Sequence, residues 1–257
     1  MPFAKVNGIR LHYAEYPKGE EAIFFLHSNI ASARWWHPVL EKLPLKYRGI
    51  ALDLRGAGLS DKPNVGHTTD QFAHDVIALA DHLNIEKFHV VGHSYGGLIA
   101  LKTALDAPKR LKSLLLMNPA PANGLHFPQP VHEMMKVWKE DWQQLAELLA
   151  SANPKTDHTT FYWQQIMDES FVASDATFLT NMVEMGKYDY SDRLHEVTCK
   201  TLITCSPHDL WIPIDDINKM LAKLPNAKKL EIQNVGHTPA LEVPELFLQA
   251  ALEFWQN

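Results

Sequence analysis

The sequence predicts an α/β fold, in which helices flank a mostly parallel central sheet and a helical segment is inserted between two strands. Short apolar runs alternate with amphipathic segments through the first 120 residues and again after residue 199. Between residues 122 and 198 the strand pattern disappears. Strands that alternate with helices of about 10 to 15 residues indicate right-handed βαβ units, and 257 residues, 46% of them hydrophobic, are enough to bury a sizeable core.

The N-terminal part of the chain is expected to alternate between strands and helices. A turn at Pro17-Lys18-Gly19 separates the first two apolar runs, and Phe72, Val76, Leu79 and Leu83 recur at helical spacing. The expected strands are 9–16, 22–27, 49–54, 88–92 and 111–117, and the expected helices are 35–42, 71–83 and 95–107.

The C-terminal part resumes the alternation, with strands at 200–206 and 228–232, a helix at 215–224 and a final helix after residue 243. In the middle of the chain, apolar residues from Val131 to Leu149 follow a helical stripe. A helical insertion between parallel strands predicts a cap over the strand ends. We therefore expect a core formed by residues 1–121 and 199–257 and a helical cap formed by residues 122–198.

Charge and composition exclude several classes of protein. The chain has 24 Lys and Arg against 30 Asp and Glu, a formal charge of −6, so it lacks the basic surface that nucleic acids or anionic membranes attract. No apolar run approaches the roughly 20 residues of a membrane-spanning helix. Cys199 and Cys205 are too far apart along one expected strand to pair, and no secretory signal pattern is visible. These features favour a cytoplasmic protein that acts on a small molecule.

The strongest chemical motif is Gly92-His93-Ser94-Tyr95-Gly96, which lies between an expected strand and an expected helix. Glycines at both ends permit a tight strand-to-helix turn, and such a turn lifts the central serine hydroxyl above the sheet. The N-terminus of the helix favours negative charge that develops beside it. The motif therefore predicts that Ser94 is a nucleophile.

A serine nucleophile needs a base and a carboxylate that orients the base. His237 follows the last expected strand, at the sheet edge where sites of α/β proteins gather, and Asp209 follows the strand before it. His27, His93 and His208 are interpreted as residues that shape loops or pack. Asp215 and Asp216 are expected to begin a helix. The order Ser94, Asp209, His237 predicts a catalytic triad.

Motifs for other chemistries are missing from the sequence. Gly56-Ala57-Gly58 lacks the third glycine of a dinucleotide-binding turn, and Pro63 argues against a helix there. The sequence has neither a P-loop nor the histidine motifs of zinc hydrolases, and both cysteines lie in one expected strand. We therefore expect neither a metal nor an organic cofactor.

The whole chain resembles the α/β-hydrolase superfamily, in particular its small esterases, lactonases and haloperoxidase-like members with a helical cap. The loop Asp53–Ser60 and the segment Asp209–Pro213 carry this resemblance together with the serine motif. It implies hydrolysis through an acyl-enzyme. The family usually has His-Gly after the third strand, but here the residues are His27-Ser28-Asn29. By position, the backbone N–H groups of Asn29 and Tyr95 are expected to form the oxyanion hole.

The predicted function is hydrolysis of a carboxylic ester or lactone of small to medium size and apolar character. Five tryptophans near the expected site are candidate pocket walls: Trp35, Trp36, Trp138, Trp142 and Trp211.

The alternatives are other chemistry on the same fold (a C–C hydrolase, a lyase or a perhydrolase-type haloperoxidase) and a ligand receptor with slow turnover. Family members that cleave dienoic diketo acids usually have tryptophan after the histidine, whereas Thr238 follows His237 here. A serine at position 94 argues against the dehalogenases and epoxide hydrolases of the family, which use aspartate.

Overall fold

The computed structural model describes residues 2–256. Within this range the strands form one eight-stranded sheet in the order β1-β2-β4-β3-β5-β6-β7-β8. The strands are β1 (Phe3–Val6), β2 (Ile9–Lys18), β3 (Glu21–Leu26), β4 (Tyr47–Leu52), β5 (Phe88–His93), β6 (Leu111–Met117), β7 (Lys200–Cys205) and β8 (Ala227–Glu231).

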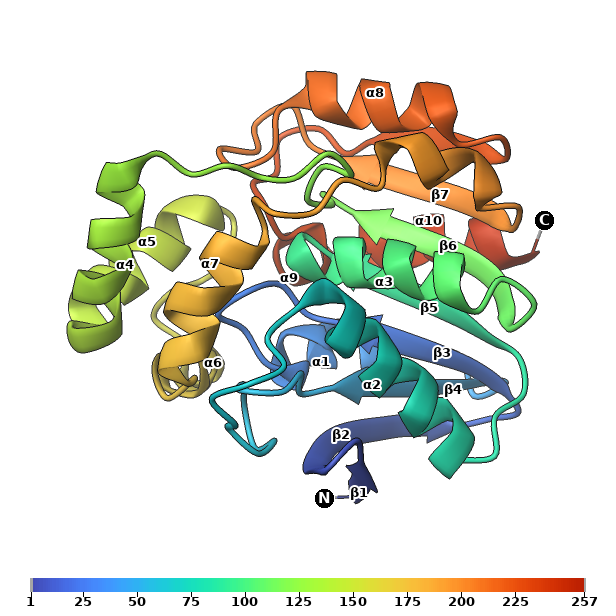
Figure 1. Cartoon of the computed structure of the whole chain (residues 1–257), viewed down its shortest axis with the longest axis horizontal. Coiled ribbons are helices and arrows are strands. Elements are labelled where there is room, and N and C mark those ends of the chain that lie inside the picture. The colour runs from blue at the N-terminus through green and yellow to red at the C-terminus, as the bar shows by residue number, and fades with distance from the viewer. Residues whose placement is uncertain (1, 257) are drawn as a thin grey trace.

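Helices connect most of the strands and cover both faces of the sheet (Figure 1). The α-helices are α1 (His37–Leu40), α2 (Thr69–His82), α3 (Tyr95–Asp106), α4 (Gln129–Glu140), α5 (Trp142–Ala152), α6 (Phe161–Phe171), α7 (Asn181–Glu184), α8 (Ile214–Lys223), α9 (Pro239–Glu242) and α10 (Pro244–Gln256). Shorter turns of 3₁₀ or π helix are η1 (Ala33–Trp36), η2 (Ala176–Thr180) and η3 (Ser191–Glu196). None of the helices in the described part of the chain is long and apolar enough to cross a membrane.

The sheet has a topological switch point beside β3, where the strands that follow β3 in the chain lie first on one side of it and then on the other. Strands β3 to β8 are parallel to one another, whereas β1 and β2 lie at one edge, where β2 is antiparallel to both β1 and β4. From β3 the chain moves first to β4 on one side and then to β5 on the other. Ligands of open α/β sheets bind outside the carboxyl ends of the strands at such a point. The loops after β3 and β5 are therefore where a site is expected.

Two apolar clusters separate the layers. Helices α2, α3 and α8 pack on one face of the sheet, where Leu79, Ile99 and Met220 belong to one buried cluster. Helices α1, α9 and α10 pack on the other face, where Phe247 and Trp255 belong to the second. The sequence prediction of a mostly parallel α/β sheet flanked by helices is thus confirmed.

Residues 122–198 contain helices α4 to α7 and no strand in the described structure. This helical segment lies to one side of the sheet, at the left of Figure 1. Helix α6 reaches the loop region after β3, because Glu169 accepts hydrogen bonds from Ser32 Oγ and Arg34 Nε at 2.6 Å each. The division into two domains at these boundaries stays a prediction.

Two details differ from the sequence expectation. Strand β1 was not expected, and it pairs with β2 at the sheet edge. Strand β2 also continues through Pro17, where a turn was expected. The register of its pairing with β4 shifts between Glu15 and Lys18, so Pro17 lies at an irregularity of the ladder. Proline is accommodated in a strand at such an irregularity, where no ladder hydrogen bond is lost.

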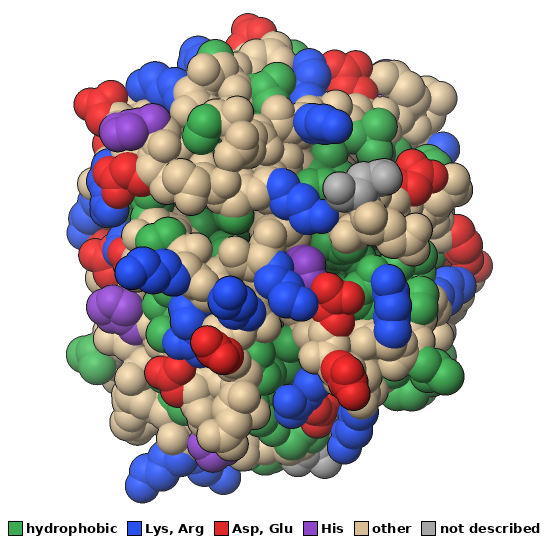
Figure 2. All heavy atoms as spheres, turned by 90° about the vertical axis from the view of Figure 1, so that its right-hand side faces the viewer, with side chains coloured by type: hydrophobic (Ala, Val, Ile, Leu, Met, Phe, Trp, Pro, Cys, Tyr) green, Lys and Arg blue, Asp and Glu red, His purple; other side chains and the backbone are tan. Residues whose placement is uncertain are grey.

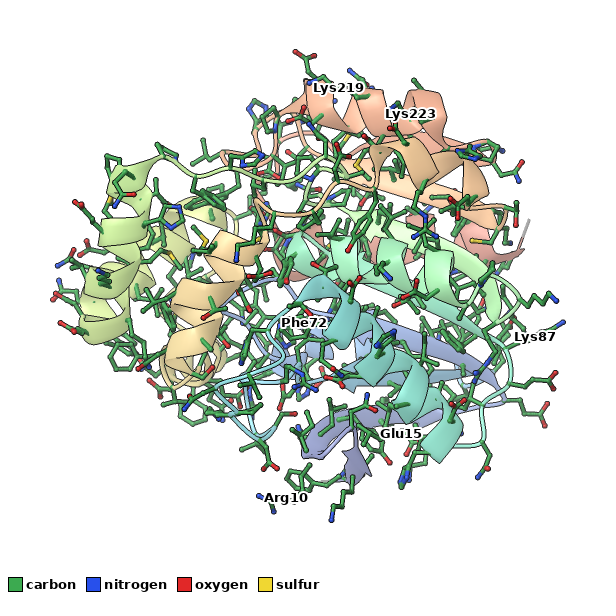
Figure 3. The ribbon with its side chains drawn as sticks, viewed as in Figure 1. Arg10, Glu15, Phe72, Lys87, Lys219 and Lys223 are labelled. Carbon is green, nitrogen blue, oxygen red and sulfur yellow. The ribbon has the colours of Figure 1, made fainter. Side chains whose placement is uncertain are left out.

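The surface at the opposite end from the helical segment carries charges of both signs. Figure 2 shows acidic and basic side chains next to one another across this face. On α8, Lys219 and Lys223 point outward (Figure 3), and each pairs with an aspartate, Asp216 and Asp192 respectively. These surfaces do not present a single sign of charge.

Candidate active site

Ser94 lies at a strained turn between β5 and α3. Its backbone has φ 52° and ψ −116°, a conformation that an L-residue adopts only where the surroundings impose it. A Cβ on Gly92 would lie 2.2 Å from the Gly96 carbonyl oxygen, and one on Gly96 would lie 2.4 Å from the carbonyl oxygens of His27 and Leu26. Both glycines are therefore required for the close approach of α3 to strands β3 and β5.

His237 and Asp209 form a hydrogen-bonded pair in the loops that follow β8 and β7. The Nδ1 atom of His237 lies 2.8 Å from Oδ2 of Asp209. A carboxylate oxygen accepts this bond, so Nδ1 carries the proton and Nε2 is left as the basic atom of the ring. Ser94 and His237 both line the same cavity. Asp215 and Asp216 lie instead in the first turn of α8, as the sequence predicts.

Four hydrogen bonds hold the Asp209 carboxylate. Besides His237, Asn118 Nδ2 donates to Oδ2 at 2.6 Å, and the backbone N–H groups of Trp211 and Ile212 donate to Oδ1 at 2.8 and 3.2 Å. Burial by itself raises the pKa of Asp209, but the attraction of His237 and these donors outweigh burial and hold the pKa below its usual value. Asp209 is therefore ionised at neutral pH.

The loop that carries His237 is fixed from three sides. The buried Glu242 carboxylate accepts from the N–H groups of Gly236 (2.8 Å) and Thr238 (3.3 Å). The His237 N–H donates to the Ala152 carbonyl at the end of α5, 2.7 Å away. On the far side, His93 Nε2 donates to the His237 carbonyl at 2.9 Å. The helical segment thus contacts the backbone of His237 directly.

The loop after β3, where the oxyanion hole is expected, is shaped by His27 and Asp53. The Leu54 N–H donates to His27 Nε2 at 3.0 Å, so the ring proton is on Nδ1, which donates to the Ser28 carbonyl at 2.7 Å. Burial lowers the pKa of His27, which favours this neutral form. The carboxylate of Asp53 accepts from the Ala33 N–H at 2.7 Å and thereby fixes the end of the loop. His27 and His93 therefore shape loops, as the sequence analysis proposed.

Asn29 and Tyr95, the expected oxyanion-hole residues, occupy the two loops at the switch point. Asn29 lines the cavity. Tyr95 is the first residue of α3, and its ring packs edge-on against Phe72, with ring centroids 5.7 Å apart. The Tyr95 side chain therefore faces the core, and Tyr95 is not among the residues that line the cavity, so the oxyanion role of its N–H stays a prediction.

The cavity at Ser94 has a volume of about 90 Å³ and lies between the core and the helical segment. Side chains of both parts form its walls: Ser28, Asn29, Ile30, Trp35, Ser94, Leu125, Phe127, Met135, Trp138, Leu148, Leu149, Ala152, Asn153, Met182, Met185, Trp211, His237 and Thr238. A wider groove of about 460 Å³ adjoins it and shares Leu125, Phe127, Met135 and Met182. These shared side chains separate the cavity from the outer surface of the helical segment.

Three of the five tryptophans expected in the pocket, Trp35, Trp138 and Trp211, line this cavity. The expectation is wrong for Trp36, because its ring packs under the opposite face of the sheet against Phe25 and Phe247. It is also wrong for Trp142, whose Nε1 donates to Asp168 on the outer side of the helical segment. Neighbours in a helical turn point to different faces, so Trp35 and Trp36 separate into two layers.

Sequence reasoning missed Asn118 and Glu242. Asn118 follows the buried strand β6 at the same sheet edge as Asp209, and a polar residue at that position was the available signal. Glu242 lies in the short helix α9, and nothing in the local sequence distinguishes it from a surface acid. Among residues 2–256, no group of three or more His, Cys, Asp or Glu side chains is arranged to hold a metal ion.

The fold agrees with that of known proteins. Residues 21–195 match the family model described as the alpha/beta hydrolase fold, and the chain belongs to that family.

The names of individual relatives indicate that they hydrolyse different kinds of bond. RutD of Caulobacter vibrioides, provisionally named a carbamate hydrolase, is 26% identical over 265 aligned residues that span 100% of this chain and 98% of that protein. The 2-hydroxy-6-oxo-6-phenylhexa-2,4-dienoate hydrolase of Comamonas testosteroni is 27% identical, covering 98% and 95% of the two chains. The crystal structure of the enol-lactonase from Burkholderia xenovorans LB400 superposes with a TM-score of 0.85 at 23% identity, covering 100% of both chains, which shows the shared fold.

Proposed function

We propose that this protein is a serine hydrolase that cleaves a carboxylic ester or lactone of small to medium size through an acyl-enzyme. The observation that carries the proposal is the hydrogen-bonded His237–Asp209 pair at a cavity that Ser94 also lines. Serine hydrolysis requires this combination of nucleophile, base and orienting carboxylate. The strained backbone at Ser94 and the glycines around it support the same role.

In the proposed mechanism, His237 Nε2 removes the Ser94 hydroxyl proton as the oxygen attacks the substrate carbonyl carbon. The N–H groups of Asn29 and Tyr95 stabilise the oxyanion, and His237 returns the proton to the departing alcohol oxygen. Water then attacks the acyl-enzyme, again with His237 as base, and releases the acid and the free serine. The ionised Asp209 stabilises the imidazolium in both steps.

The walls of the cavity support a substrate with an apolar body. Leu125, Phe127, Met135, Met182 and Met185 come from the helical segment and enclose the space above Ser94. Burial of apolar substrate surface against such side chains supplies binding energy, while a few polar groups set the orientation. The two unpaired cysteines, Cys199 and Cys205, support a reducing compartment such as the cytoplasm.

The test is hydrolysis of a panel of 4-nitrophenyl esters, lactones and a dienoic diketo acid by the purified protein and by Ser94→Ala. We expect turnover that favours apolar acyl groups, a loss of about 10⁴-fold or more in the variant, and labelling of Ser94 by a fluorophosphonate. Unchanged activity in Ser94→Ala would exclude the mechanism. Tight binding with a single slow turnover would indicate a receptor, and release of products only from a diketo acid would indicate C–C hydrolysis.

A further inference from the structure

The cavity at Ser94 is small for a substrate site, and a larger space adjoins it. Its volume is about 90 Å³, whereas ligand pockets of proteins usually measure roughly 300–1,000 Å³. The adjoining groove has a volume of about 460 Å³ and lies between α4, the turn η2 and α7. Cavity and groove together therefore have the size of an ordinary ligand site.

A thin partition separates the cavity from the groove. Four residues line both spaces: Leu125, Phe127, Met135 and Met182. Each of them has the cavity on one side and the groove on the other, so the partition is one residue thick. Methionine is unbranched, has three rotatable side-chain bonds and adapts to irregular spaces. Met135 and Met182 can therefore turn aside to let a substrate chain pass.

The groove carries positive charge in an otherwise acidic segment. Residues 122–198 contain five Lys and Arg against twelve Asp and Glu. The described residues that line the groove nevertheless include Lys136, Lys187, His126 and His132 and neither an aspartate nor a glutamate. The groove thus differs in sign from the segment that forms it, and its charge favours an anionic ligand.

Lys136 is a cation of the groove that a ligand can bind. Lys187 already pairs with Glu184, whose Oε1 lies 2.6 Å from Nζ. Lys136 is exposed on α4, and within residues 2–256 its ammonium has neither a hydrogen bond nor an ion pair. The buried side chains of Phe178 and Met182 line the same groove. An apolar chain that packs on them can present an anionic end to Lys136.

We propose that the groove binds the distal end of the substrate and that Lys136 pairs with a carboxylate there. The substrate class is then an ester or lactone with an apolar chain that crosses the partition and ends in this carboxylate. The rings of His126 and His132 offer further N–H donors to the same group. This inference rests on the proposed serine hydrolase function and makes its substrate more specific.

The experiment uses the mono-4-nitrophenyl esters of adipic, suberic and sebacic acids, each with the primary amide of the same chain length. The measured quantity is the ratio of kcat/KM for the carboxylate to that for the amide. Intrinsic reactivity cancels when this ratio is compared between variants. Acetate esters of ω-hydroxy acids and of their amides, followed by pH-stat, place the carboxylate on the alcohol side instead.

In Lys136→Met we expect the ratio to fall by about 2- to 5-fold at the chain length that fits best, as the loss of one exposed ion pair implies. Lys136→Glu should lower it further, because repulsion replaces attraction. In the wild type, 0.5 M NaCl should lower the ratio toward that of Lys136→Met, since salt screens exposed charges. An unchanged ratio in both variants, at every length and in both series, would overturn the inference.

Lys87→Met is the matched control for the loss of one charge. Lys87 is exposed at the opposite end of the molecule from the helical segment (Figure 3), so its replacement should leave the ratio unchanged. An equal fall in Lys87→Met and Lys136→Met would show an effect of net charge alone and would contradict binding at Lys136.

Met182→Ala tests whether the chain crosses the partition. Removal of this side chain opens the cavity toward the groove, so kcat/KM for the sebacic half-ester should rise relative to that for 4-nitrophenyl acetate. Met135→Ala serves as a second variant if Met182→Ala disturbs folding. Met134→Ala, on the exposed side of α4 and lining neither space, should leave this preference unchanged. The same preference in the partition variants and the wild type would show that the chain does not pass here.

Failure of this inference is distinguishable from failure of the proposed function. If the protein hydrolyses the esters through Ser94 and the ratio does not depend on Lys136, the groove inference is wrong and the hydrolase stands. If no ester is hydrolysed, calorimetry with monomethyl suberate compares Ser94→Ala with the double variant Ser94→Ala/Lys136→Met. Weaker binding by the double variant would support the groove site without the hydrolase, and equal dissociation constants would overturn it.

Discussion

At the residue scale, Asp209 is hydrogen-bonded to more parts of the site than the sequence around it indicates. Its carboxylate receives hydrogen bonds from the loop after β8, from the end of β6 and from its own loop. A buried carboxylate with this many donors stays ionised and fixed in direction, which is what an orienting acid requires. Asn118 thus participates in the site without reaching the cavity.

We expect Asp209→Asn to lower kcat for ester hydrolysis by up to about 10⁴-fold while the protein stays folded. An amide cannot stabilise the imidazolium and favours the wrong tautomer of His237. Stopped-flow or steady-state assays with 4-nitrophenyl esters measure the activity, and circular dichroism checks the fold.

Asp215→Ala and Asp216→Ala are the matched controls. Both residues lie in the first turn of α8, where an acid stabilises the helix by up to about 1 kcal/mol. We expect a small decrease in thermal stability and nearly full activity. Loss of activity in either control together with an active Asp209→Asn would show that the acid has been assigned to the wrong residue.

At the element scale, the site depends on how closely α3 approaches the sheet. Gly96 lies in the first turn of α3 against the carbonyl groups at the end of β3, and Gly97 lies against Pro119 after β6. Alanine is the better helix former by about 1 kcal/mol, so glycine at both positions is unfavourable for the helix by itself. The packing of the helix on the sheet explains these two residues.

Gly96→Ala should lower the free energy of unfolding by about 3 kcal/mol and abolish most activity, because its Cβ would meet backbone oxygens at 2.4 Å. In Gly97→Ala the Cβ would meet the Pro119 Cβ at 2.8 Å, so a smaller loss is expected. Urea unfolding of both variants measures the difference. A Gly96→Ala protein as stable as the wild type would show that α3 can move away from β3 without cost.

At the scale of the whole molecule, stability depends on histidines that are buried in their neutral form. Burial lowers the pKa of His27, His89 and His93, the last well below its usual value. The unfolded chain then binds more protons than the folded chain below a pH of about 6.5. This contribution to stability is fully present above that pH and is lost progressively as the pH falls toward the lower pKa of the folded state.

We therefore expect the urea midpoint to fall between pH 7 and pH 5, with a limiting slope of about 1.4 kcal/mol per pH unit for each such histidine. His93→Gln can keep the hydrogen bond to the His237 carbonyl and removes one titrating group, so its pH dependence should be shallower. The Asp209 contribution is lost only at lower pH, because its pKa is below the usual carboxyl range. An identical pH dependence in His93→Gln and wild type would refute the assignment of this loss to His93.

The order of the main elements and the chemical motifs were readable from the sequence because each depends on neighbouring residues. Strand β6 begins and ends where expected, and α2, α3 and α8 differ from expectation by one or two residues at their ends. The turn at Ser94 was predictable because its glycines are two residues away from it. Strand β1 was missed, since four residues at a sheet edge give too little pattern.

The α/β class, the family, the strand-to-helix turn at Ser94 and the chain order of Ser94, Asp209 and His237 can be read from the sequence, because they follow from local pattern and connectivity. Which polar groups meet is fixed by the packing of the folded chain: Asn118 with Asp209 across 91 residues, and Asn29 with Asn181 across 152. This packing also places Trp35 at the cavity and Trp36 under the sheet. Hydrophobic periodicity indicates that a residue is buried. Its partner across a layer depends on how separate elements pack against each other, and the spacing of residues along the chain does not specify that packing.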